Sequence, residues 1–99
     1  MYRIEYTKEA YRKIKNLDKK IKERLKKGIE FLAKNPMRGK RLTGPLVGKW
    51  SYRVGDYRII YGIYPEKLVI LVLSIGHRKE IYKKRSNYSV YRILYVWLF

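Results

Sequence analysis

The chain has 99 residues, which is enough for one small domain with one modest core. Hydrophobic residues make up 46% of it, which excludes a disordered chain, and the absence of cysteine excludes disulfides and thiol catalysis. Lysine and arginine together number 25 against 8 aspartates and glutamates, for a formal net charge of +17. This excess favours a polyanionic partner, with nucleic acid first and an acidic protein second; a basic surface without a specific partner is the alternative.

The first third of the chain predicts a strand and two helices. Residues Tyr2 to Tyr6 alternate in polarity as a short strand does. Thr7 is a suitable N-cap for a helix over residues 8–16, and Asp18 is expected to cap a longer helix that ends near Lys34. The second helix carries one apolar stripe, made of Ile21, Leu25, Ile29 and Leu32.

The lysines of the second helix lie mostly outside this stripe. They are Lys19, Lys20, Lys22, Lys26 and Lys27. They form either a solvated face or a surface that contacts phosphates. Asn35 and Pro36 end the helix, because the residue before proline disfavours the helical region.

The rest of the chain predicts a sheet. Residues 37–47 form a basic loop that contains glycine and proline, and three antiparallel strands follow. These strands are Trp50–Val54, Tyr57–Tyr64 and Leu68–Ile75, with a turn at residues 65–67. Gly76 is expected to open another turn that leads to a last short strand or turn at Tyr82. The order predicts an α+β domain with a short N-terminal strand, two helices and then an antiparallel sheet of three to four strands, with the helices on one face.

Gly55 and Asp56 separate two of these strands and read as a two-residue hairpin turn. That register places Val54 opposite Tyr57 and Arg53 opposite Arg58. Because side chains alternate along a strand, Ser51, Arg53, Arg58 and Ile60 would share one sheet face. Two arginines opposite each other repel, so the pairing lowers stability unless a polyanion lies across it.

The sequence lacks the residue sets that most catalytic mechanisms require. The single histidine, His77, has no histidine or cysteine cluster around it, no phosphate-binding glycine loop is present, and the eight acidic residues are scattered. What remains is a cationic surface with aromatic residues, made of Arg53, Arg58, His77, Arg78, Tyr82, Lys83, Lys84 and Arg85. Such a surface suits RNA cleavage without a metal, in which a 2′-hydroxyl attacks the neighbouring phosphate and arginines stabilise the added charge.

Two segments together are similar to the RelE/ParE superfamily of toxins. They are residues 53–61, Arg-Val-Gly-Asp-Tyr-Arg-Ile-Ile-Tyr, and residues 76–82, Gly-His-Arg-Lys-Glu-Ile-Tyr. The order of elements agrees as well, and the resemblance covers residues 1–85. It implies the fold of that superfamily, a cognate antitoxin as partner, and either of two activities. RelE-like members cut mRNA on the ribosome, whereas ParE-like members inhibit DNA gyrase.

The RelE-like branch implies roles for particular residues. Arg58 matches the strand arginine that contacts the scissile phosphate, Arg78 the later arginine and Tyr82 the C-terminal tyrosine. Arg53 stands where some members carry a lysine, and Ser51 departs from the pattern because another lysine can occur there. The departure leaves the general base open. His77 could replace it, since imidazole has a pKa of about 6.5, or it could cap the turn at Gly76.

The resemblance to RelE-like members also leads to expectations about RNA contacts, cofactors, partners and cellular location. Lys49, Ser51, Lys83 and Lys84 are expected to contact RNA. No cofactor and no metal are expected, and the partners would be the antitoxin, the ribosome and mRNA. The charged start of the chain has no secretion signal pattern, which predicts a cytoplasmic protein. An inactive RNA-binding member of the superfamily is a further alternative.

Residues 86–99 form an apolar, aromatic tail beyond the predicted domain of residues 1–85. The tail is too short to span a bilayer, which takes about 20 apolar residues. It could add an edge strand, cover an apolar groove, pair with a second copy, or promote aggregation.

Overall fold

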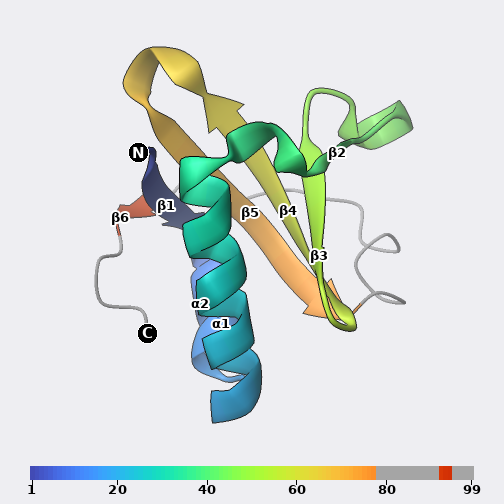
Figure 1. The fold of residues 1–99 in the computed structure, drawn as a ribbon. Coiled ribbons are helices and arrows are strands. Elements are labelled where there is room, and N and C mark those ends of the chain that lie inside the picture. Colours follow the sequence, from blue (N-terminus) through green and yellow to red (C-terminus); the bar gives the residue numbers. More distant parts are fainter. Residues whose placement is uncertain (78–91, 95–99) are drawn as a thin grey trace.

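The computed structural model describes residues 1–77 and the backbone of residues 92–94 (Figure 1). Its helices and strands are, in chain order, β1 (Arg3–Thr7), α1 (Lys8–Lys15), α2 (Lys19–Lys34), β2 (Lys40–Arg41), β3 (Trp50–Val54), β4 (Tyr57–Tyr64), β5 (Val69–His77) and β6 (Arg92–Leu94). Three single-turn 3₁₀ helices lie in the connections, at Pro36–Arg38, Gly44–Leu46 and Pro65–Lys67. The predicted α+β class is confirmed.

The sheet has six strands in the described residues, in the order β2-β3-β4-β5-β1-β6. The meander β3-β4-β5 is antiparallel as predicted, but β1 pairs with β5 in parallel. The prediction of three to four strands was therefore too low. The eight residues from Val69 to Gly76 are all buried, and such a strand requires a neighbour on each edge. β4 and β1 supply those neighbours.

The predicted tail contributes β6, which adds an antiparallel edge strand to β1 at Glu5–Thr7. The edge strand is one of the alternatives that the sequence left open. The remainder of the tail, residues 86–91 and 95–99, lies outside the described residues.

Thr7 joins β1, α1 and β5 at one point. Its side chain accepts a hydrogen bond from the Ala10 amide at 3.2 Å, so it is the N-cap that the sequence predicted. The same hydroxyl donates to the carbonyl of Leu73 at 2.6 Å, and Thr7 is fully buried. Asp18 also stands at an N-cap position, but its side chain makes no capping bond, and α2 begins at Lys19.

The two faces of the sheet pack differently. One face and both helices form the main core, in which Leu25 and Leu32 of α2 are fully buried (Figure 1). The other face holds a separate and smaller apolar cluster. It consists of Ile60, Leu71 and Leu73, with Leu42 and Tyr64 packed against it. We call the first face the helix face and the second the open face.

A β-bulge in β5 changes which face its residues occupy. Ile60 pairs with Ser74 but Tyr61 pairs with Val72, so Leu73 is the extra residue. Before the bulge Leu71 lies on the open face; after it, Ile75 packs into the main core and Gly76 pairs with Arg58.

The prediction of a turn at Gly76 was wrong, because β5 continues through Gly76 to His77. The predicted end of α2 is confirmed at Lys34, as is the turn at residues 65–67. Neither described helix combines the length and the apolar character that a membrane crossing takes.

Candidate nucleic-acid interface

The β3–β4 hairpin has the predicted register. Arg53 pairs with Arg58 and Ser51 pairs with Ile60, so these four residues share the open face. Gly55 adopts a φ of +61° in the turn, a conformation that favours glycine. The two arginines therefore stand side by side on a sheet face that neither helix covers, and their charges repel.

The two arginines differ in how they are held. Arg53 is exposed, and its Nε donates to the carbonyl oxygen of Gly55 at 2.9 Å, which orients the guanidinium along the turn. Arg58 is half-buried, with its Nε enclosed by the protein. Ser51 is only 2% exposed, so the residue at the position of a family lysine does not extend into solvent. A phosphate above this face would meet Arg53 first and Arg58 more deeply.

His77 lies on the helix face. Its ring contacts Tyr57 edge-on, with 5.9 Å between ring centroids and 75° between planes, and Tyr57 packs against the main core. The sequence placed His77 in one cationic surface with Arg53 and Arg58, whereas the structure separates it from them by the thickness of the sheet. Its role in proton transfer stays a prediction.

Four further predicted site residues lie outside the described residues. They are Arg78, Tyr82, Lys83 and Lys84. Arg85, which the sequence placed in the same cationic surface, lies outside them as well.

A hydroxyl on the helix face holds the basic loop against the sheet edge. The Tyr61 hydroxyl donates to the Pro36 carbonyl at 2.7 Å and accepts from the Gly39 amide at 3.1 Å. A Cβ atom at Gly39 would collide with that hydroxyl and stand 2.8 Å from the Ser51 carbonyl, so this position requires glycine. Burial raises the pKa of Tyr61 to about 12, which keeps the donor protonated. Sequence reasoning missed this contact, because it joins residues far apart in the chain.

A pocket of about 310 Å³ opens farther along β4. It is lined by Gly48, Lys49, Gly62, Ile63, Tyr64 and Leu73. Lys49 was expected to contact RNA, and the structure places it in the lining of this pocket together with Tyr64. Alternation from Arg58 would have indicated Tyr64, since residues 58, 60, 62 and 64 fall on one face.

Glu5 is the buried carboxylate of the described residues, and it pairs with Arg3 at 3.1 Å. It lies opposite Leu71, which lies opposite Gly62, four residues along β4 from Arg58. That spacing is about 13 Å along the strand before the lateral separation is added, so Glu5 is not placed to take a proton near Arg58. Within residues 1–77, no three metal-binding side chains gather into one group.

Comparisons with known proteins agree with this architecture. The family model described as the ParE toxin of the type II toxin-antitoxin system parDE matches residues 4–82. The chain belongs to the RelE/ParE superfamily of type II toxins. The toxin is 34% identical over 88 residues to a protein named Toxin RelG from Mycobacterium tuberculosis, covering 84% of this chain and 98% of that protein. It is 30% identical over 97 residues to the mRNA interferase toxin RelE of Escherichia coli, and this match covers 94% of this chain and 98% of that protein.

Solved structures of related proteins share the fold of this toxin. The toxin-antitoxin complex RelBE2 of Mycobacterium tuberculosis contains a chain with a TM-score of 0.66 at 34% identity, covering 78% of this chain and 98% of that one. The isolated RelE toxin of Escherichia coli has a TM-score of 0.68 at 25% identity, and this match covers 84% of this chain and 93% of that one. These matches confirm the predicted superfamily.

Proposed function

We propose that this toxin is a ribosome-dependent endoribonuclease that cuts mRNA without a metal. The observation that carries the proposal is the placement of Arg53 directly opposite Arg58 on the open face. Paired cations there reduce stability unless they meet a polyanion. The Escherichia coli relative, which is named an mRNA interferase, supports RNA as that polyanion.

In the proposed reaction a ribose 2′-oxygen forms a bond to the adjacent phosphorus while the bond from phosphorus to the 5′-oxygen breaks. The proton leaves the 2′-hydroxyl for a base, and another proton reaches the departing 5′-oxygen. Arg58 and Arg78 would stabilise the negative charge that develops on the phosphate, because a guanidinium can bond two oxygens at once. Arg53 would hold the RNA backbone, and Tyr82 would stack on the substrate or give up the proton.

Positioning and charge stabilisation would contribute more than proton transfer in this site. Ser51 has no basic group, and lysine or arginine at an ordinary pKa is a poor base near pH 7. His77 would have to act around the end of β5, because its ring lies with Tyr57 on the helix face. A change of His77 to glutamine is expected to have a smaller effect on cleavage than a change of Arg58.

The RNA would continue along β4 from the arginines toward the pocket beside Lys49. There the Tyr64 ring could stack on a base and the Lys49 ammonium could contact a phosphate, with Lys83 and Lys84 as further contacts. The lysines of α2 would dock on ribosomal RNA. In this proposal residues 1–85 are the toxin domain, residues 86–99 are a tail of separate role, and the protein works in the cytoplasm.

A cognate antitoxin is the proposed protein partner. Related chains were solved in complexes described as toxin-antitoxin complexes, including RelBE2 of Mycobacterium tuberculosis. With a net charge of +17, this toxin would bind an acidic segment that folds on contact.

The proposal is tested by primer extension on mRNA from a purified translation system, with and without the toxin. We expect discrete cuts in the ribosomal A site that disappear in Arg58→Ala and persist in Arg12→Ala, a matched change on α1. Cuts of wild-type strength in Arg58→Ala would refute the role of Arg58. Ribosome binding without cuts would instead indicate an inactive RNA-binding member.

Inhibition of DNA gyrase is the second candidate function, because the matching family model is described by the ParE toxin. A supercoiling assay with purified gyrase separates the two functions. Inhibited supercoiling together with an absence of mRNA cuts would favour it.

A further inference from the structure

Ser51 lies among basic residues on the open face. Its partner on β2 is Lys40, and its partner on β4 is Ile60. Residues two positions apart along a strand share a face, so Lys49 and Arg53 flank Ser51 along its own chain. Ser51 is only 2% exposed, whereas Lys40 and Arg53 are exposed. Three of the four neighbours of this short side chain are therefore long cations that extend beyond it.

Two observations place Lys40 on the open face. Opposite residues of an antiparallel pair share a face, and Lys40 lies opposite Ser51. Leu42, two residues farther along, packs against the apolar cluster of the open face, and its amide donates to the Lys49 carbonyl at 2.9 Å. Because side chains alternate along an extended chain, Lys40 lies on the same side as Leu42.

The backbone at Lys40 is held from the helix face. Gly39, the residue before it, donates its amide to the Tyr61 hydroxyl at 3.1 Å, and that hydroxyl donates to the Pro36 carbonyl at 2.7 Å. A Cβ atom at Gly39 would stand 2.8 Å from the Ser51 carbonyl oxygen, so the two chains are in close contact at this point. Lys40 therefore projects from a fixed backbone, although β2 has only two residues.

Arg41, the other residue of β2, provides an internal comparison. It pairs with Trp50, and its guanidinium lies over the Trp50 ring at 5.2 Å from the centroid. Trp50 packs against the main core and stacks on Tyr61, with 6.4 Å between ring centroids. Lys40 and Arg41 are both basic and exposed, but Arg41 lies on the helix face. A ligand on the open face meets only Lys40.

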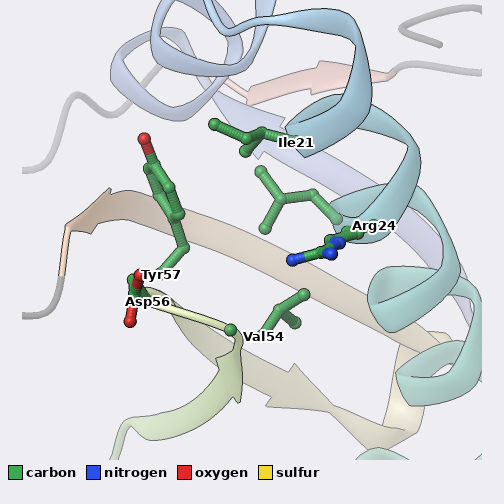
Figure 2. Close-up of a pocket in the computed structure, with 7 residues that line it drawn as sticks. Ile21, Arg24, Val54, Asp56 and Tyr57 are labelled. Atoms are coloured by element: carbon green, nitrogen blue, oxygen red, sulfur yellow. The ribbon is translucent and has the colours of Figure 1, made fainter.

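The cations around Ser51 have no carboxylate among them in this part of the chain. Residues 37–64 contain one acidic residue, Asp56. Figure 2 shows it in the β3–β4 turn beside Tyr57, where it lines a pocket of about 240 Å³ on the helix face. That turn lies about 14 Å along β3 from Ser51. Within the described residues, Lys40 forms no ion pair.

We propose that Lys40 binds a phosphate of the RNA on the open face. The phosphate lies above Ser51, between the Lys40 ammonium and the Arg53 guanidinium, and the next phosphate along the RNA reaches Arg58. Opposite Cβ atoms of an antiparallel pair are about 5 Å apart and diagonal neighbours about 7–8 Å, so two long side chains can reach one phosphate. Lys40 thus provides the ammonium group that Ser51 lacks. The inference rests on the proposed function in taking RNA as the ligand.

The test measures binding of a short single-stranded RNA whose 2′-oxygens are methylated, so that it cannot be cut. Fluorescence polarisation gives its affinity for the full chain at several salt concentrations. Lys40→Gln should weaken binding at least about fivefold and lower the slope of log affinity against log salt by about 0.7, because one phosphate contact is lost. Arg41→Gln removes the same charge from the adjacent residue and should weaken binding less than about twofold, with the slope unchanged.

Moving the lysine to the neighbouring strand tests its position rather than its charge. Lys40→Gln/Ser51→Lys returns an ammonium to the same row of the open face and should restore most of the lost binding. Lys40→Gln/Asn16→Lys restores the net charge at the exposed end of α1 and should not restore binding. Because Ser51 is buried, Lys40→Arg gives a second check that leaves it in place, and this variant should bind as wild type does.

The result separates this inference from the nuclease proposal. Equal losses in Lys40→Gln and Arg41→Gln, or equal recovery by the two double variants, would overturn the inference whatever the toxin does on the ribosome. Binding that requires Lys40, in a toxin that leaves ribosomal mRNA uncut, would support the inference and refute the nuclease proposal. Each variant is first compared with wild type by thermal unfolding, so that a loss of binding is not a loss of fold.

Discussion

The two faces of one sheet perform opposite tasks in this toxin. The helix face buries Leu25, Leu32 and their neighbours from both helices, and it is almost free of charge. The open face places Arg53 against Arg58 and holds a smaller apolar cluster. Adjacent residues of a single strand, Arg58 and Ile59, belong to different faces. Alternation therefore lets one hairpin contribute stability on one side and a site with unfavourable charge repulsion on the other.

The largest expected effect is the loss of core packing on the helix face. Leu32→Ala should lower the free energy of unfolding by about 2–5 kcal/mol, because it removes a fully buried side chain and leaves a cavity. Leu71→Ala on the open face should cost less, because fewer buried side chains surround it. Urea unfolding measures the free energy of unfolding of both variants. Met37→Ala, at an exposed residue, is the control. Equal costs on the two faces would mean that the open face is a full second core.

The next largest effect is expected from removing the Tyr61 hydroxyl, which joins the helix face to the basic loop. Tyr61→Phe should lower the free energy of unfolding by about 1–3 kcal/mol, because it leaves the Pro36 carbonyl and the Gly39 amide without their partner. Denaturant unfolding near pH 7 measures this change. An unaltered stability would show that the contact does not hold the loop.

Tyr61 is also expected to make the stability of the protein depend on pH. Burial raises the pKa of Tyr61 to about 12, above the value near 10 in the unfolded chain. The folded state thus holds the proton more tightly, so this contribution to stability is complete below pH 10 and is lost as the pH rises toward 12. The free energy of unfolding, measured from pH 10 to pH 12, should fall less steeply with pH in Tyr61→Phe than in wild type. Burial also raises the pKa of Tyr6, so some dependence should remain.

The smallest expected effect is on the stability of the arginine pair. Arg53→Gln removes the repulsion from Arg58 but also the exposed bond to the Gly55 carbonyl, so the free energy of unfolding should change by less than about 1 kcal/mol. RNA affinity should fall nonetheless, and its dependence on salt concentration should become weaker. Titration of labelled RNA at several salt concentrations measures this. A large loss of stability would place Arg53 among the structural residues.

Local patterns carried the parts of the fold that the sequence could predict. The apolar spacing of Ile21 to Leu32 predicted α2, and the Gly55–Asp56 turn predicted the register that brings Arg53 to Arg58. The parallel pairing of β1 with β5 was not predictable from those patterns, since the alternation of a strand does not name its partner.

One extra residue explains the placement of His77. Without the bulge at Leu73, the odd-numbered residues of β5 would stay on the open face, and His77 would share that face with Arg58. The bulge moves Ile75 and His77 to the helix face, and nothing in the local run of apolar residues marks where it occurs. Arg78, Tyr82, Lys83 and Lys84 lie outside the described residues, so their roles stay predictions.

The most direct measurement compares the two neighbours Arg58 and Ile59 in the same pair of assays, ribosomal mRNA cleavage and thermal unfolding. Arg58→Gln should reduce cleavage by about 100-fold or more while unfolding stays near that of wild type, because the guanidinium stabilises charge rather than packing. Ile59→Val should lower the unfolding temperature and leave cleavage nearly unchanged below that temperature. Cleavage at the wild-type rate by a folded Arg58→Gln would contradict the assignment of the open face as the catalytic face.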